Sequence, residues 1–178
     1  MSPSYPQAYL DYLRLFHLDR DYFECHEVLE EHWKKSPGDP LAIAWVGLIQ
    51  TAVALYHERR GNRSGAGKMF AACASNLAKT DLLPLGIDGP RLLAAIDEKL
   101  QILNTEENVP YSDLNIPIMD DDLLRTCLNG SGDGRKWGQP SDMSDDELLH
   151  KHTRRDRSDV IEARRAELLR RGRAGSGD

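Results

Sequence analysis

The sequence has few of the features that mark secreted, membrane-spanning or disulfide-stabilised proteins. Its three cysteines, Cys25, Cys73 and Cys127, are odd in number and far apart, which favours reduced thiols in the core over a disulfide framework or a zinc site. The first twenty residues have neither the basic start nor the continuous apolar run of a signal peptide. The longest apolar segment, residues 41–56, is shorter than a membrane span. We therefore expect a cytoplasmic protein with no membrane partner.

The chain as a whole also lacks an excess of positive charge. Its net charge is −6, so it has no electrostatic reason to bind nucleic acid or anionic lipid. Residues 150–173 are the exception, because they hold nine Lys and Arg against four Asp and Glu on a predicted helix with a thin apolar stripe. We interpret this basic helix as a solvated, partly frayed extension. The alternative is that it docks a partner or makes a weak contact with RNA.

No segment shows the strict alternation of apolar and polar residues that strands require. Apolar residues recur instead at helical spacing, which predicts an all-α fold, a compact bundle of about five antiparallel helices with a helical C-terminal extension. Residues 41–59 are apolar on nearly every side, as expected of a central helix. The other predicted helices are one opened by Ser4 and Pro6, then 22–35, 66–79, one that begins at residue 90, and a short helix at 120–128.

Three regions are expected along the chain. Residues 1–128 form the helical bundle domain, and the Gly-rich residues 129–142 form a linker. Residues 143–178 form a charged helical or partly disordered extension, whose last helix Ser144 and Glu147 would open as a capping box. Removal of residues 130–178 is then expected to leave the melting temperature nearly unchanged.

The helix at 22–35 carries polar residues where an apolar stripe is expected. His26 and Glu30 lie one turn apart on the inward face, beside Cys25 and Leu29. Gln50 and His57 lie two turns apart on the central helix, in an otherwise apolar segment. A buried polar group without a partner costs about 1–3 kcal/mol, so these residues should satisfy one another. We predict a semi-buried cluster of His26, Glu30, Gln50 and His57.

Two interpretations of this cluster stay open. The favoured one is a hydrogen-bonded network that fixes the packing of two helices. The alternative is a divalent metal held by His26, Glu30 and His57 with an open position for water. The segment "HEVLE" is not a zinc-protease motif, because Glu30 stands where the second histidine is needed. No cofactor is expected under the favoured interpretation.

Residues 61–69, "GNRSGAGKM", superficially resemble a phosphate-binding loop. Five residues rather than four separate Gly61 from the Gly67-Lys68 pair, and Met69 stands where a Ser or Thr would hold magnesium. We predict instead that Gly61 ends the central helix and that Asn62 or Ser64 caps the next one.

Two blocks of this sequence, "DYFECHEVLEEHWK" and "LIQTAVALYHERRGNRSGAGKMF", closely resemble the domain-of-unknown-function 309 family of small all-helical bacterial and archaeal proteins. The resemblance covers about residues 10–105 and implies a compact helical bundle with no established activity. The family pattern falls on the four predicted cluster positions and on the flanking residues Glu27, Trp33, Tyr56 and Asn62, among others.

Two classes of function follow. In the first, the protein is a binding or assembly module whose partner is another protein or a second copy, and the polar cluster is architectural. In the second, it is a metal-dependent hydrolase or small-ligand enzyme that uses His26, Glu30 and His57. Glu27 would be its base, although it points about 100° away from His26. The first class is favoured, and the sequence leaves open whether the protein is an enzyme.

Overall fold

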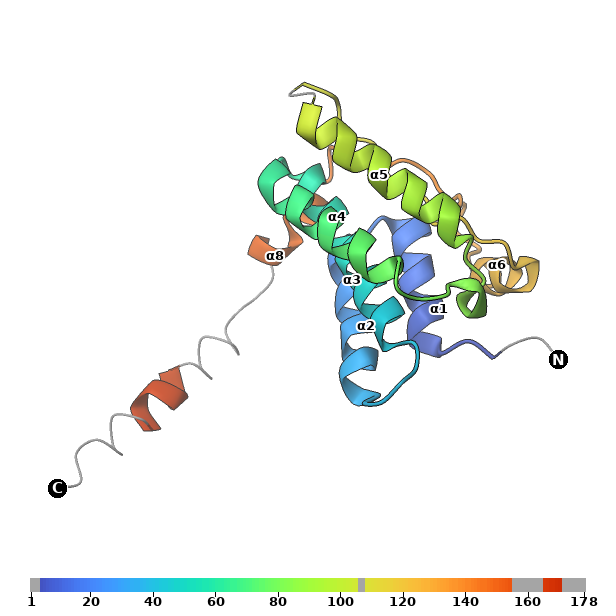
Figure 1. Ribbon diagram of the computed structural model, residues 1–178. Helices are drawn as coiled ribbons and strands as arrows, with labels where there is room; N and C mark the ends of the chain where they lie inside the picture. Colours follow the sequence, from blue (N-terminus) through green and yellow to red (C-terminus); the bar gives the residue numbers. More distant parts are fainter. Residues whose placement is uncertain (1–3, 106–107, 155–164, 171–178) are drawn as a thin grey trace.

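The computed structural model describes residues 4–105, 108–154 and 165–170, and it confirms the all-α fold (Figure 1). Within these ranges no strand occurs, and a single isolated bridge pairs Ile87 with Ile118. The helices are α1 (Gln7–Arg14), the π-helix η1 (Leu15–Asp19), α2 (Tyr22–Lys35), α3 (Ala42–Arg59), α4 (Arg63–Leu77), the 3₁₀ helix η2 (Leu83–Leu85), α5 (Gly89–Thr105), α6 (Asp121–Leu128), α7 (Asp146–Leu149) and α8 (Lys151–Arg154). Residues 165–170 are also helical, and we call them the tail helix.

Helix α3 is the centre of the bundle, as its apolar composition predicted. Helices α2 and α4 pack on it, α1 packs on α2, and α5 packs on α4. Helix α4 approaches closely at Gly47, where an added Cβ would lie 2.5 Å from Cδ2 of Leu77. The Tyr12 hydroxyl donates to the Leu48 carbonyl at 2.7 Å and ties α1 to the same helix. Cys25, Cys73 and Cys127 are buried free thiols, in agreement with the sequence analysis.

The segment between α1 and α2 is helical for most of its length. The chain continues as η1 and reverses at Arg20, which has a left-handed backbone conformation (φ 53°). His17 is buried in this π-helix, with Nδ1 2.9 Å from the Leu13 carbonyl and Nε2 accepting from the Ile116 amide at 3.0 Å. Burial, reinforced by the charge of Arg20, lowers the pKa of His17 to about 3. The ring is therefore neutral and Nδ1 donates.

Helix α4 begins three residues earlier than predicted. The Asn62 side chain caps it by accepting from the Gly65 amide at 3.0 Å, so one of the two predicted caps is correct. Helix α7 is capped by Asp145, which accepts from the Leu148 amide, whereas the sequence pointed to Ser144 and Glu147. None of the described helices is both long and apolar enough to cross a membrane.

Part of the expected linker, residues 129–142, packs on the bundle. Trp137 stacks on His17, with ring centroids 4.1 Å apart and planes 12° apart. The Gly138 amide donates to the His17 carbonyl at 3.0 Å, and Arg20 Nε donates to the Gln139 carbonyl at 2.7 Å. We call residues 137–154 the C-terminal arm. The predicted boundary at residue 128 therefore separates segments that are bonded to each other.

Candidate binding face on helices α2 and α3

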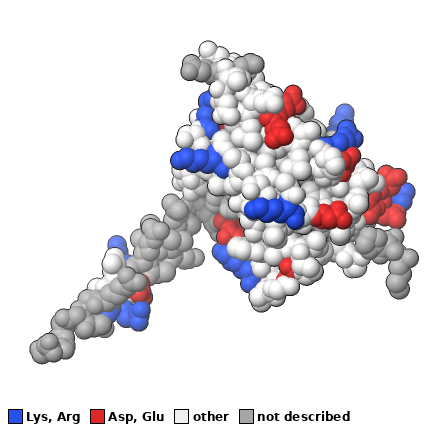
Figure 2. Space-filling model, in the orientation of Figure 1, with Lys and Arg blue, Asp and Glu red and all other residues white. Residues whose placement is uncertain are grey.

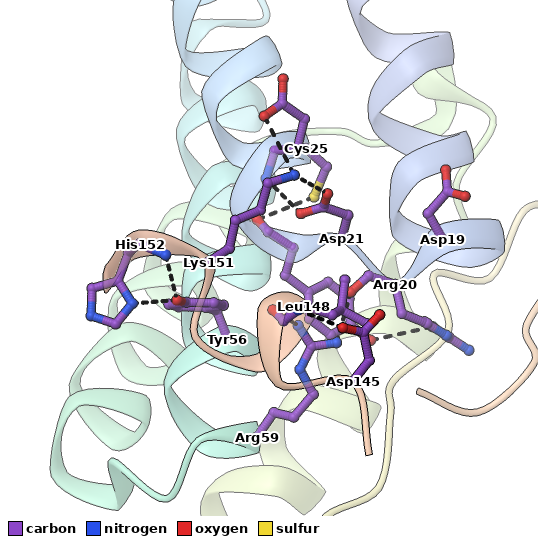
Figure 3. Close-up of polar contacts among 12 residues, drawn as sticks. Asp19, Arg20, Asp21, Cys25, Tyr56, Arg59, Asp145, Leu148, Lys151 and His152 are labelled. Atoms are coloured by element: carbon purple, nitrogen blue, oxygen red, sulfur yellow. Dashed lines mark hydrogen bonds and ion pairs between the residues drawn. The ribbon is translucent and has the colours of Figure 1, made fainter. Parts of the chain in front are cut away.

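The C-terminal arm lies on the ends of α2 and α3 that meet near Arg59. The Arg59 side chain is buried, and its guanidinium lies over the Tyr22 ring, 4.7 Å from the centroid. It donates to the carbonyl of Arg20 at 2.7 Å, the hydroxyl of Ser141 at 3.0 Å and the carbonyl of Leu148 at 3.3 Å (Figure 3). The Arg59 guanidinium thus connects α3 to the residues at the start of α2 and to Ser141 and Leu148 of the arm.

Two further contacts hold the end of the arm. Lys151 pairs with Asp21, whose other carboxylate oxygen caps α2 by accepting from the Glu24 amide (Figure 3). The Tyr56 hydroxyl accepts from the His152 amide at 3.1 Å and also bonds Nδ1 of that histidine. The two rings meet edge to face at 5.3 Å. Leu149 is buried between these polar contacts, so the arm is bound by both apolar and charged groups.

His57 lies beside this contact on α3. Its Nδ1 lies 3.1 Å from a guanidinium nitrogen of Arg60 and 3.1 Å from Nδ2 of Asn62. Both neighbours can only donate, so Nδ1 accepts and the ring is held in its neutral form. Burial lowers the pKa of His57, and the charges of Arg60 and His152 lower it further.

The structure pairs the other three cluster residues with different neighbours. Glu30 forms an ion pair with Lys34 at 2.7 Å, one turn along α2. Gln50 faces α4 and accepts from Asn76 Nδ2 at 2.9 Å. His26 lies edge-on to Phe23, with ring centroids 5.0 Å apart. Among the described residues no hydrogen bond joins any two of the four.

An aromatic chain nevertheless connects the two histidines. Phe23 follows His26 in this chain, and its ring centroid lies 5.7 Å from that of Tyr56, which in turn lies 6.4 Å from the His57 ring. Tyr56 and Asn62, predicted as flanking residues, both take part in this face. Trp33 lies at the exposed end of α2, and Glu27 shares a surface hollow with Glu30 and Glu31.

The predicted metal ligands are not gathered. In the parts of the chain that the structure describes, no three His, Cys, Asp or Glu side chains are arranged to hold an ion. His57 Nδ1 is occupied by two donors and Glu30 by Lys34, as described above. A metal at His26, Glu30 and His57 stays a prediction that the described geometry does not support.

The main polar centre was missed by the sequence analysis. Asp113 Oδ1 accepts from the hydroxyls of Tyr22, Tyr111 and Ser141, each at 2.6 Å, and Oδ2 accepts from the Ser141 amide at 2.6 Å. Burial alone would raise the pKa of Asp113, but the bonds from Ser141, Tyr111 and Tyr22 outweigh it and hold the pKa below its usual range. Asp113 lies in a segment with little periodicity, so no sequence signal marked it.

Arg59 was also missed, although a signal existed. It lies three, four and seven residues after Tyr56, Leu55 and Ala52, which are all buried, so helical spacing places it on the core face of α3. A charged residue on such a face implies a buried partner.

A cavity of about 460 Å³ separates the start of α2 from α7. Its walls are Asp21, Phe23, Glu24, Asp145, Glu147, Leu148 and Lys151. Of the polar groups around it, Asp21 and Asp145 cap helices, and Asp21 and Glu24 pair with Lys151 (Figure 3). In the described part of the chain the arm occupies this face, with Lys151 paired to Asp21 and His152 bonded to Tyr56.

Comparisons with known proteins agree with this architecture. Residues 9–69 match the family described as a domain of unknown function (DUF309). An uncharacterised protein of Bacillus subtilis (strain 168), YpuF, is 43% identical over 173 residues, which cover 94% of this chain and 97% of YpuF. The alignment therefore includes the C-terminal arm as well as the bundle. No solved structure matches. With this identity over nearly the whole of both chains, the protein belongs to the DUF309 family.

Proposed function

We propose that this protein is a binding module in which the bundle anchors the C-terminal arm and the arm presents the tail helix to a partner. One observation carries the proposal. Leu168 and Leu169, in the tail helix, are 70% and 62% exposed, although residues directly before residue 154 are bound by the bundle. Figure 1 shows the tail helix standing away from the bundle. Covering an exposed leucine with another apolar surface contributes about 1.5–3 kcal/mol, so two adjacent leucines favour a partner.

The charge of the tail supports a protein partner. Arg165 and Arg170 accompany the two leucines, and Arg170 pairs with Glu167 of the same helix at 2.8 Å; Figure 2 shows basic side chains and an acidic side chain along this part of the molecule. A helix with an apolar pair flanked by arginines is suited to an apolar groove with an acidic rim. Free nucleic acid would use the arginines alone and would leave the leucines in water.

The metal-dependent alternative lacks a comparable observation. Two of the three candidate ligands, Glu30 and His57, are engaged with other neighbours, and Arg59 of the α2–α3 face bonds the arm. The binding-module function accounts for the bonds between this face and the arm. An arm that presents the tail helix to a partner must itself be held in place on the bundle.

A cross-linking experiment tests this proposal. A photoreactive amino acid replaces Leu169 in the full chain, and a control chain carries it at the exposed Glu31 of α2. We expect a specific partner from the first position only. The captured protein, once purified, should bind the wild-type chain at least about tenfold more tightly than the Leu168→Asp, Leu169→Asp variant, because apolar anchors carry most of the binding energy. Equal affinity, or identical capture at both positions, would contradict the proposal.

A further inference from the structure

An apolar groove lies where the end of α4, η2 and the start of α5 meet. Its volume is about 480 Å³, and its walls are Leu77, Ala78, Thr80, Asp81, Leu82, Leu83, Asp88, Gly89, Pro90, Leu93 and Met119. Leu77 and Leu82 are buried at its base. Leu83 and Met119 are 62% and 56% exposed at its edge. We call it the α4–α5 groove.

The groove has acidic side chains and no basic ones among its walls. Asp81 and Asp88 each use one carboxylate oxygen to accept from a backbone amide, of Leu83 and Arg91 respectively. In the described part of the chain neither carboxylate is paired with a Lys or Arg. Met119 is followed directly by Asp120, Asp121 and Asp122, and Figure 2 shows acidic side chains gathered at this end of the molecule, over α6.

The groove and the tail helix complement each other. Of the large apolar side chains in the described residues, the four most exposed are Leu168, Leu83, Leu169 and Met119, two from each surface. The groove contributes two carboxylates, whereas the tail helix carries two arginines against one carboxylate, that of Glu167, which pairs with Arg170. Their net charges are therefore opposite. In a single copy both surfaces are left uncovered.

We propose that the partner of the tail helix is a second copy of this chain, with Leu168 and Leu169 of each copy inserted into the α4–α5 groove of the other. This inference rests on the proposed function and names its partner. In a reciprocal exchange, the groove and the tail helix of each copy are both occupied by the other copy. The result is a closed symmetric dimer, and no groove or tail helix is left free to bind a third copy. It buries the four exposed apolar side chains together and places arginines beside Asp81 and Asp88.

The oligomeric state of the purified full chain tests the inference. Sedimentation is measured from about 1 μM to about 1 mM, a range that spans typical weak and moderate affinities. The tail variant carries Leu168→Asp and Leu169→Asp, and the groove variant carries Leu83→Asp and Met119→Asp. Ile43→Asp is the matched control, because Ile43 is also exposed and apolar but lies on α3, away from both surfaces.

The wild-type chain and the Ile43→Asp control should form dimers, and each of the other two variants should dissociate at least about tenfold more readily. A mixture of the tail and groove variants should form a one-to-one complex, because one intact tail then meets one intact groove. A monomeric wild-type chain, a dimer insensitive to the groove variant, or a mixture that does not associate would overturn the inference. If the chain is monomeric but Leu169 still captures another protein, the proposed function stands and only the partner assigned here is wrong.

Discussion

Replacement of Asp113 by alanine is expected to destabilise the fold, because this carboxylate is shared by four donors from three separate segments. Tyr22 belongs to α2, Tyr111 to the segment after α5, and Ser141 to the C-terminal arm. Alanine removes the acceptor and leaves the donors in place. The hydroxyl of Tyr22 is in the core, where water cannot replace the lost bond.

The size of the effect follows from the burial of each donor. A buried donor without a partner costs about 1–3 kcal/mol, and bonds to a charged acceptor are at the upper end. The Tyr22 hydroxyl contributes most, because Tyr22 is buried whereas Tyr111 and Ser141 are half-buried. We therefore expect the free energy of unfolding to fall by about 2–4 kcal/mol. Asp142→Ala is the matched control: this neighbouring aspartate is exposed and bonds only to nearby backbone and side-chain groups of its own turn, so the loss should be within about 0.5 kcal/mol.

Urea unfolding followed by circular dichroism measures both variants. A double-mutant cycle with Tyr22→Phe should show coupling of at least about 0.5 kcal/mol, since the two groups share a bond. The pKa of Asp113 is lower in the folded state than its ordinary value of 3.8, so its stabilisation is present above that value. The difference between wild type and Asp113→Ala should accordingly shrink as the pH falls below 3.8. Equal losses for Asp113→Ala and Asp142→Ala would refute the role assigned to this centre.

Three further predictions concern packing, protonation and the arm. Gly47→Ala should destabilise by about 1–3 kcal/mol in urea unfolding, because the new methyl group meets the leucine of α4, whereas Gly67→Ala, in an open position on α4, should stabilise by about 0.4–1 kcal/mol. Because the pKa of His17 is about 3 in the fold and 6.5 in its ordinary state, the stabilisation from the neutral ring is complete above pH 6.5 and is lost as the pH falls toward 3. NMR titration should therefore find the His17 ring unprotonated at about pH 4.5. Truncation after Lys136 should lower the melting temperature by at least about 4 °C, the shift expected from about 2 kcal/mol, while truncation after Arg154 should change the melting temperature of the monomer by less than about 2 °C.

The truncation prediction replaces the expectation drawn from the sequence. Glycine-rich composition at residues 129–142 indicated a linker, and composition reports only local conformational freedom. It does not report that Trp137 stacks on His17 or that Ser141 bonds Asp113. Those contacts depend on where distant segments are brought together, and the free energy they supply decides whether a Gly-rich segment is bound.

The predicted polar cluster shows the same limit. Helical periodicity pointed to a partly buried position for His57, and the capping preference of asparagine pointed to Asn62 at the start of α4, where it accepts from the Gly65 amide. Periodicity predicts which face of a helix a side chain occupies. It does not predict which residue of another helix lies opposite that face. Glu30 therefore pairs with Lys34 on its own helix and Gln50 with Asn76, and neither bonds to His26.

The sequence by itself determined the helical class, the central position of α3, the burial of the three thiols and the membership of the DUF309 family. The first three depend on composition or on spacing within one helix, which the chain carries locally. Only the tertiary structure decided that Asp113, Arg59 and the C-terminal arm form the polar centre. Tyr22 and Asp113 are 91 positions apart, and bonds over such separations exist only after the helices have packed and excluded water from the groups between them.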